Sequence, residues 1–176
     1  MNIAAISGSL KSTSSNTNIL KTIAALAPEN VHISIVNGLE KLPHFSPDIE
    51  AGDKFVNDFR KQISKAAGVI FSTPEYAFGI PGSLKNALDW LVSSGELNEK
   101  PIAAISASPL YSGGDKALAS LLLTLTALGT RFDAQSSISI GNIKNKMSPD
   151  GTITDAATIQ ALQSLLNNLM EKISQS

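Results

Sequence analysis

Apolar residues along the chain follow two patterns that alternate with each other. Short apolar runs bounded by turn-forming residues predict buried strands, and longer segments with apolar residues every three or four positions predict amphipathic helices. The predicted strands cover residues 2–7, 31–36, 68–72, 102–106 and 136–140. The predicted helices cover residues 16–27, 53–67, 83–93, 115–128 and 155–173.

The regular alternation of strand and helix predicts an α/β fold, a parallel sheet between two layers of helices. Each helical segment is long enough to return the chain for a right-handed crossover. A five-stranded doubly wound sheet can have the order 2-1-3-4-5, with a ligand crevice beyond the carboxyl ends of strands 1 and 3. Another five-stranded Rossmann-like order is the alternative, because periodicity does not report strand order. We expect a single domain over residues 1–176.

Composition and charge exclude several classes of function. The 14 basic and 15 acidic residues give a formal net charge of −1 without any basic run, so nucleic acid and membranes are not expected partners. The chain has no cysteine, which leaves any redox reaction to a bound cofactor. The apolar stretch at residues 3–6 is too short for a signal sequence, and no stretch approaches the length of a membrane span. We therefore expect a cytoplasmic protein.

The segment after the first predicted strand has the composition of a phosphate site. Residues 7–18 are rich in glycine, hydroxyls and amides, contain one lysine and lead directly into a helix. A helix N-terminus offers unpaired N–H groups and the positive end of its dipole, and Lys11 adds a charge. The alternative is that Ser14 or Ser15 only caps the helix. The loop lacks the glycine motifs for triphosphates and dinucleotides, which favours a mononucleotide.

The segment after the third predicted strand has the features of a rim for a flat ring. Residues 73–91 contain two prolines and two glycines, which stiffen and shape the loop. A planar heteroaromatic ring needs fixed backbone donors at its edge and an apolar surface against its face. Residues 74–79 can supply both, and we expect Tyr76 and Phe78 to line the site. Trp90 is expected to be buried instead of stacking on a ligand.

Together these two loops resemble the signature loops of the NADPH-dependent FMN reductase family, which includes chromate, quinone and azo-dye reductases. The matching residues are Gly8-Ser9-Leu10-Lys11-x-x-Ser14-x-Asn16 and Pro74-Glu75-Tyr76, then Pro81-Gly82-x-Leu84-Lys85-Asn86-Ala87-x-Asp89-Trp90. The chain departs from the family at Lys11, where arginine is usual, and at Ala77, where asparagine is usual. Lysine is a point charge without arginine's fork, so weaker phosphate binding is expected. One side-chain contact near the flavin is also expected to be lost.

The resemblance implies a flavodoxin-like three-layer sandwich that binds FMN, with NADPH or NADH as co-substrate. It implies a small-molecule electron acceptor such as a quinone, a free flavin, an azo or nitro compound, or chromate. The flavin carries the chemistry, so no catalytic side chain is expected. A loop of small residues after the fourth strand completes the implied site. The residues expected to bind the cofactor are Ser9, Lys11, Ser14, Ser15, Asn16, Thr17, Pro74, Glu75, Tyr76, Ala77, Phe78, Gly79, Ser106, Ser108, Gly113 and Gly114.

Two other functions are alternatives at this point. A flavodoxin-type electron carrier would bind FMN without turnover of pyridine nucleotide, although such carriers are usually strongly acidic. The other alternative is a flavin-free scaffold whose crevice has lost its ligand. A metal site is not expected, because His32 and His44 have no acidic residue at ligand spacing. The sequence also lacks the Gly-x-Ser-x-Gly motif of a hydrolase.

The segment 117–128 is apolar in nearly every helical direction. One face of this helix is expected to meet the sheet and another a second subunit, which predicts a homodimer or homotetramer. The alternative is a helix covered by another part of the same chain. In the preceding helix, Leu84 and Leu88 are expected core residues, and Lys85 and Asp89 are an expected surface pair.

Overall fold

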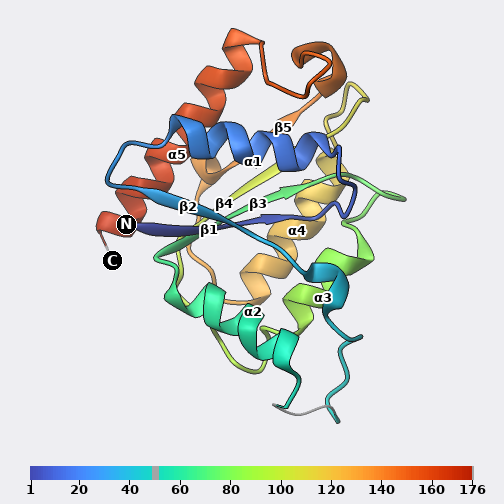
Figure 1. Ribbon diagram of the computed structural model, residues 1–176, viewed down its shortest axis with the longest axis vertical. Helices are drawn as coiled ribbons and strands as arrows, with labels where there is room; N and C mark the ends of the chain where they lie inside the picture. Colours follow the sequence, from blue (N-terminus) through green and yellow to red (C-terminus); the bar gives the residue numbers. More distant parts are fainter. Residues whose placement is uncertain (49–51, 176) are drawn as a thin grey trace.

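The computed structural model describes residues 1–48 and 52–175 of the chain. Its centre is a five-stranded parallel sheet in the order β2-β1-β3-β4-β5, with helices on both faces (Figure 1). This order confirms the predicted 2-1-3-4-5 sheet and excludes the alternative order. The strands are β1 (Asn2–Ser7), β2 (His32–Val36), β3 (Gly68–Thr73), β4 (Ile102–Ala107) and β5 (Ser137–Ile140). The α-helices are α1 (Ser15–Leu26), α2 (Lys54–Lys65), α3 (Gly82–Asp89), α4 (Asp115–Ala127) and α5 (Ala156–Ser174), and the 3-10 helices are η1 (Leu39–Lys41), η2 (Ala134–Ser136) and η3 (Ile143–Lys146).

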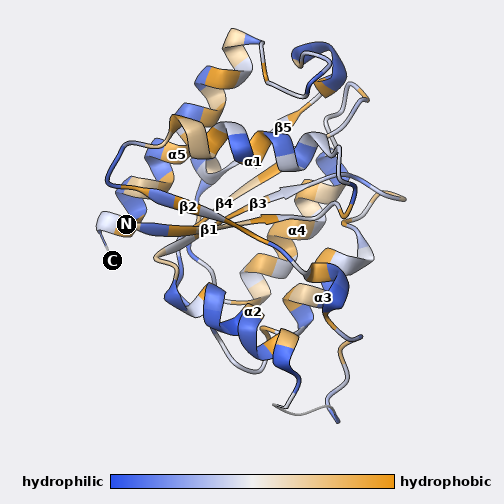
Figure 2. Ribbon diagram, viewed as in Figure 1, coloured by the Kyte–Doolittle hydropathy of each residue, from blue (hydrophilic) through white to orange (hydrophobic). Residues whose placement is uncertain are grey.

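The sheet separates two apolar cores. Helices α1 and α5 cover one face, and α2, α3 and α4 cover the other (Figure 1). Along β1, Ala4 and Ile6 belong to one core and Ile3 and Ala5 to the other, because successive side chains point to opposite faces. The inner strands β3 and β4 are buried along their whole length, whereas the edge strands β2 and β5 are not. Figure 2 shows apolar residues concentrated on the central strands and polar residues over much of α2.

Side-chain caps begin three of the helices within one residue of the predicted starts. The hydroxyl of Ser14 accepts a hydrogen bond from a backbone N–H in the first turn of α1. The carboxylates of Asp53 and Asp155 accept equivalent bonds at α2 and α5. Each cap satisfies a backbone donor that has no partner within its helix.

Helix α3 is shorter than predicted. It ends at Asp89, and the backbone continues as tight turns in which Val92 N–H donates to the Asp89 carbonyl. These i→i+3 bonds replace the helical ladder, so the predicted extension to residue 93 is wrong. Leu84 and Leu88 are fully buried, and Lys85 forms the expected ion pair with Asp89.

Helix α4 packs one side against its own chain. Ala117, Leu118, Leu121 and Leu125 are buried, whereas Leu123 is 74% exposed. The predicted subunit contact on the exposed side stays a prediction. Neither α4 nor any other helix among the described residues combines the length and apolarity that a membrane crossing requires.

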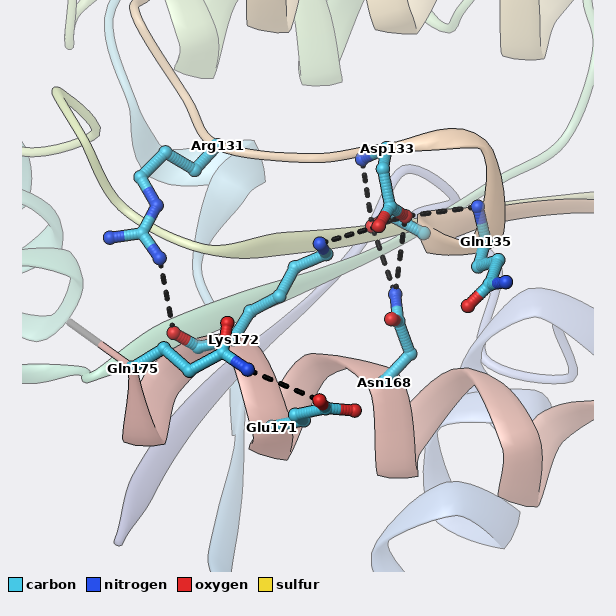
Figure 3. A network of polar contacts seen from close by, with 8 residues as sticks. Arg131, Asp133, Gln135, Asn168, Glu171, Lys172 and Gln175 are labelled. Carbon is cyan, nitrogen blue, oxygen red and sulfur yellow. Dashed lines mark hydrogen bonds and ion pairs between the residues drawn. The ribbon is translucent and has the colours of Figure 1, made fainter.

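A polar network fastens α5 to the segment before β5 (Figure 3). The Asp133 carboxylate pairs with the ammonium of Lys172 and accepts hydrogen bonds from Ser136 Oγ and Asn168 Nδ2. The Arg131 guanidinium donates to the Lys172 carbonyl oxygen at 3.1 Å. The Lys172 contact contributes most, and with the other hydrogen bonds it lowers the pKa of Asp133 from its ordinary 3.8 to about 2.

Parallel pairing brings the carboxyl ends of β1, β3 and β4 to one edge of the sheet (Figure 1). Ser7 pairs with Ser72, and Thr73 pairs with Ser106. The loops that follow these strands therefore lie next to one another, as the predicted crevice requires.

Candidate functional site

The loop after β1 begins with a close approach to β3. The N–H of Gly8 donates to the Ser72 carbonyl at 2.8 Å, and a Cβ at Gly8 would lie 2.9 Å from Thr73 Oγ1. A side chain at position 8 would press against the side chains of Thr73 and Leu84, which favours glycine here. The loop then turns through Lys11, whose carbonyl accepts a hydrogen bond from Ser14 N–H at 3.1 Å, and α1 follows.

The start of α1 presents donors that the protein itself does not use. In the part of the chain that the structure describes, the backbone N–H groups of Thr13, Ser15 and Thr17 have no protein acceptor. The Ser14 cap satisfies only Asn16 N–H, at 3.2 Å. Free N–H groups at the positive end of a helix dipole match the oxygens of a phosphate monoester. The Ser14 cap therefore accounts for only one of the donors at this helix start.

A cavity of about 200 Å³ opens where the loops meet. It brings together residues of the first loop, the loops after β3 and β4, and the segment after β5. The lining residues are Ser9, Lys11, Thr13, Ser14, Ser15, Asn16, Pro74, Glu75, Tyr76, Ala107, Ser108, Pro109, Ile143 and Lys144. Among the predicted residues, those that do not line it are Thr17, Ala77, Phe78, Gly79, Ser106, Gly113 and Gly114.

The side chain of Asn16 is committed to the protein interior. It is 3% exposed, its Nδ2 donates to the Ala107 carbonyl at 3.3 Å, and its Oδ1 accepts a hydrogen bond from Ser72 Oγ at 2.9 Å. Asn16 thereby ties the first turn of α1 to the ends of β3 and β4. The hydroxyl of Thr17 is hydrogen-bonded to Ser7 Oγ at 2.9 Å, and Thr17 lines a neighbouring cavity of about 430 Å³.

The loop after β3 contains a two-residue turn with unusual backbone angles. Tyr76 and Gly79 exchange both backbone hydrogen bonds, at 3.0 and 2.9 Å, around Ala77 and Phe78. These two residues have φ values of 48° and 61°, as in a type I′ turn, which normally selects Asn-Gly. A bulky residue such as Phe78 is strained at positive φ. The turn also gives a backbone reason for asparagine at position 77, since asparagine tolerates this region.

The carboxylate of Glu75 caps a helix from outside that helix. Its Oε2 accepts a hydrogen bond from the N–H of Ala117 at 3.0 Å, in the first turn of α4. The residue before α4 is Gly114, which has no side chain to offer and a φ of 84°. A Cβ at Gly114 would lie 3.3 Å from the Glu75 Cβ. Glu75 therefore joins the loop after β3 to α4, and Gly114 lets it approach.

The loop after β4 is held against the end of β5. The N–H of Ser108 donates to the Ile140 carbonyl at 3.2 Å, and a Cβ at Gly113 would lie 2.8 Å from Gly141 N. The hydroxyl of Ser106 is hydrogen-bonded to Ser139 Oγ at 2.9 Å, so this side chain is occupied between strands.

The remaining residues of the second motif hold a different loop. Trp90 Nε1 and Asn86 Nδ2 both donate to the Pro43 carbonyl, at 2.8 and 3.0 Å, and Asn86 Oδ1 accepts from Phe45 N–H at 2.7 Å. The rings of Phe45 and Trp90 meet edge to face, with centroids 5.1 Å apart. Trp90 is 2% exposed, which confirms that it is buried. Trp90 thereby holds residues 43–45 against the end of α3.

Five lining residues lie outside the predicted set, namely Thr13, Ala107, Pro109, Ile143 and Lys144. The first three stand within segments that were already assigned to the site. The other two follow β5, and a search of every loop at the carboxyl edge of the predicted sheet would have included them.

Positive charge gathers around the first loop. Among the described residues, no carboxylate forms an ion pair with Lys11, Lys21 or Lys144. These cations are therefore available to an anionic ligand. The described residues contain no group of three His, Cys, Asp or Glu side chains that could hold a metal ion.

A doubly wound parallel sheet in the order 2-1-3-4-5, with helices on both faces, defines a flavodoxin-like fold. The family model for NADPH-dependent FMN reductase matches residues 1–144. This chain belongs to the NADPH-dependent FMN reductase family.

Relatives with assigned names agree with this membership. The chain is 28% identical to a quinone reductase of Escherichia coli over 179 residues, covering 98% of this chain and 95% of the relative. It is 30% identical to an NAD(P)H-dependent FMN reductase of Pseudomonas aeruginosa over 171 residues, covering 95% and 92%. The flavoenzyme NAD(P)H:acceptor oxidoreductase FerB of Paracoccus denitrificans superposes with a TM-score of 0.83 at 27% identity, covering 99% and 97%. The family that the two motifs resemble is thus confirmed.

Proposed function

We propose that this protein is an FMN-dependent oxidoreductase that uses NADPH or NADH to reduce a small acceptor such as a quinone or a free flavin. Family membership over residues 1–144 supports the reaction class. The observation that carries the assignment to this chain is the set of unused N–H donors at the start of α1, beside Lys11 and at the edge of the loop after β3. That donor set fits the phosphate of FMN.

The chain contributes binding and orientation. Residues 13–17 and Lys11 would hold the phosphate, and the backbone of Pro74, Glu75 and Tyr76 would hold the ring edge. When bound, FMN supplies the redox chemistry, accepting hydride from the reduced nucleotide and passing electrons to the acceptor. The strained turn after Tyr76 follows the three residues of this loop that line the cavity, and it leaves Phe78 79% exposed. We therefore assign Phe78 to the space above the ring, where nucleotide and acceptor would bind in turn.

A visible spectrum of the protein with FMN, followed by anaerobic addition of NADPH and then NADH, tests the proposal. Bound yellow flavin that bleaches with either nucleotide supports a reductase with ping-pong kinetics. Bound flavin that stays oxidised would instead support the electron carrier, and a protein that retains no flavin would contradict both functions.

Lys11 provides a test of the phosphate site. Lys11→Ala is expected to weaken FMN binding by about 1 to 2 kcal/mol, because a charge-assisted contact to the phosphate is lost. Titration of the apoprotein with FMN, followed by flavin fluorescence, measures this change. Lys41→Ala is the control, since Lys41 does not line the cavity. An affinity for FMN equal to that of the wild type would remove Lys11 from the site.

A homodimer or homotetramer in the cytoplasm, where reduced pyridine nucleotide is available, completes the proposal. The support for an oligomer is the exposed apolar side of α4, where Leu123 is 74% exposed, and Val92 after α3, which is 64% exposed. Light scattering at micromolar concentration tests it. A monomeric mass would contradict the oligomer, and Leu123→Glu should shift an oligomer towards monomer.

A further inference from the structure

The segment after β5 borders the phosphate end of the candidate site. Lys144 lies in η3 and lines the cavity together with Lys11, Ser14 and Ser15. Neither of the two sequence motifs reaches this segment, because the second motif ends at Trp90. The position of Lys144 in the site therefore comes from the tertiary structure alone.

The two residues before Lys144 are hydrogen-bonded to the loop after β4. Asn142 is left-handed, with φ 53°, and its N–H donates to the Leu110 carbonyl at 3.0 Å. Ile143 is 1% exposed in the core, and its N–H donates to the Ser108 carbonyl at 3.1 Å. These contacts hold η3 against the loop after β4. The backbone of Lys144 is therefore held beside the cavity that the start of α1 also lines.

The charges around η3 distinguish Lys144 from Lys146. Lys144 forms no ion pair with a carboxylate of the described chain. Lys146 does not line the cavity. Its charge contributes, after the Thr158 hydrogen bonds, to the lowered pKa of Asp155. The acid that lines the cavity itself, Glu75, is engaged with the start of α4. Lys144 is thus the cation of η3 that is open to a ligand.

We propose that Lys144 supplies a second positive charge for the phosphate of FMN, beside Lys11. The inference rests on the proposed function, because it assumes that FMN is the ligand. A phosphate monoester carries between one and a half and two negative charges at neutral pH, as in a phosphorylated side chain. Lys11 offers one point charge in place of the arginine fork that is usual in the family. A cation from the segment after β5 compensates for that difference.

The test compares FMN with riboflavin, which has the same ring and ribityl chain but no phosphate. The full-length apoprotein and three variants, Lys144→Ala, Lys144→Arg and Lys146→Ala, are titrated with each flavin, and Kd is measured from the quenching of flavin fluorescence. Lys144→Ala should raise the Kd for FMN about tenfold, as expected for loss of one charge-assisted contact, and should leave riboflavin unchanged. Lys144→Arg should restore FMN binding. Lys146→Ala has the same change in net charge and should bind FMN like the wild type.

Four outcomes overturn the inference. An unchanged Kd for FMN in Lys144→Ala would show that Lys144 does not contact the phosphate. The proposed function would stand, because the wild type binds FMN. Equal weakening of FMN and riboflavin means that Lys144 acts through the loop and not through the phosphate. Equal weakening by Lys144→Ala and Lys146→Ala means that only the overall charge matters. A wild type that binds neither flavin overturns the proposed function itself, and the inference with it.

Discussion

The loops after β1 and β3 form opposite parts of the candidate site and are built in opposite ways. The loop after β1 has no residue at positive φ and leaves the N–H groups of Thr13, Ser15 and Thr17 without a protein acceptor. The loop after β3 uses its own donors in the turn between Tyr76 and Gly79 and places two non-glycine residues at positive φ. A relaxed loop with unused donors suits a charged group, whereas a strained turn whose two end residues pair with each other offers a fixed shape.

The largest expected effect on stability concerns the Asn16 side chain, whose hydrogen bonds join the start of α1 to the ends of β3 and β4. Asn16→Ala would leave Ser72 Oγ and the Ala107 carbonyl without their partner in a buried place. We expect the free energy of unfolding to fall by about 3 kcal/mol, and FMN binding to weaken with it. Urea denaturation measures the first effect. Asn167→Ala, on the exposed side of α5, is the control, and equal stability of the two variants would show that these hydrogen bonds contribute nothing.

Next in size is the cap that joins the second loop to α4. Glu75→Ala removes the hydrogen bond to Ala117 N–H, and we expect a loss of about 1 to 2 kcal/mol of stability. Glu75→Gln keeps an acceptor without the charge and should lose less. Thermal unfolding measures Tm for the wild type and both variants, and Glu75→Ala should have the lowest Tm. If both melt with the wild type, Glu75 is not a cap in solution.

The backbone strain in the loop after β3 predicts a substitution that raises stability, in contrast to the two losses above. Phe78→Gly should raise the free energy of unfolding by about 1 kcal/mol, because glycine suits φ 61° and the lost side chain is exposed. Tyr111→Gly is the matched control, since Tyr111 is 90% exposed with an ordinary φ, and it should not stabilise the protein. A Phe78→Gly variant that is less stable than the wild type contradicts the strain.

The smallest effect lies outside both loops, at Asp133 (Figure 3). Its folded pKa of about 2 is below the ordinary 3.8, so its contribution to stability is complete above pH 3.8 and is lost as the pH falls towards 2. The carboxylate is 45% exposed, so solvent screening should keep this contribution below about 1 kcal/mol. Urea midpoints of the wild type and Asp133→Asn should therefore converge between pH 4 and 2. A constant difference across that range would contradict the assignment.

The site was only partly predictable from the sequence. Lys11, Ser14, Ser15 and residues 74–76 were identified because they follow strand ends in a recognisable order, and they do line one cavity. Asn16 was assigned to the ligand, yet its amide is used between strands. An amide side chain can hydrogen-bond either to a ligand or to the protein. The folded position of Ser72 shows that Asn16 bonds to the protein.

Alternating apolar runs and helical periods were sufficient to predict the five β/α units, because burial on one or both faces imposes those periods directly on the chain. The two motifs were sufficient to indicate the family, because each lies within one continuous segment. Lys144 and the partner of Glu75 depend instead on which segments meet across the sheet edge. That meeting is set by strand order and long-range packing, so these contacts are defined only in the folded molecule.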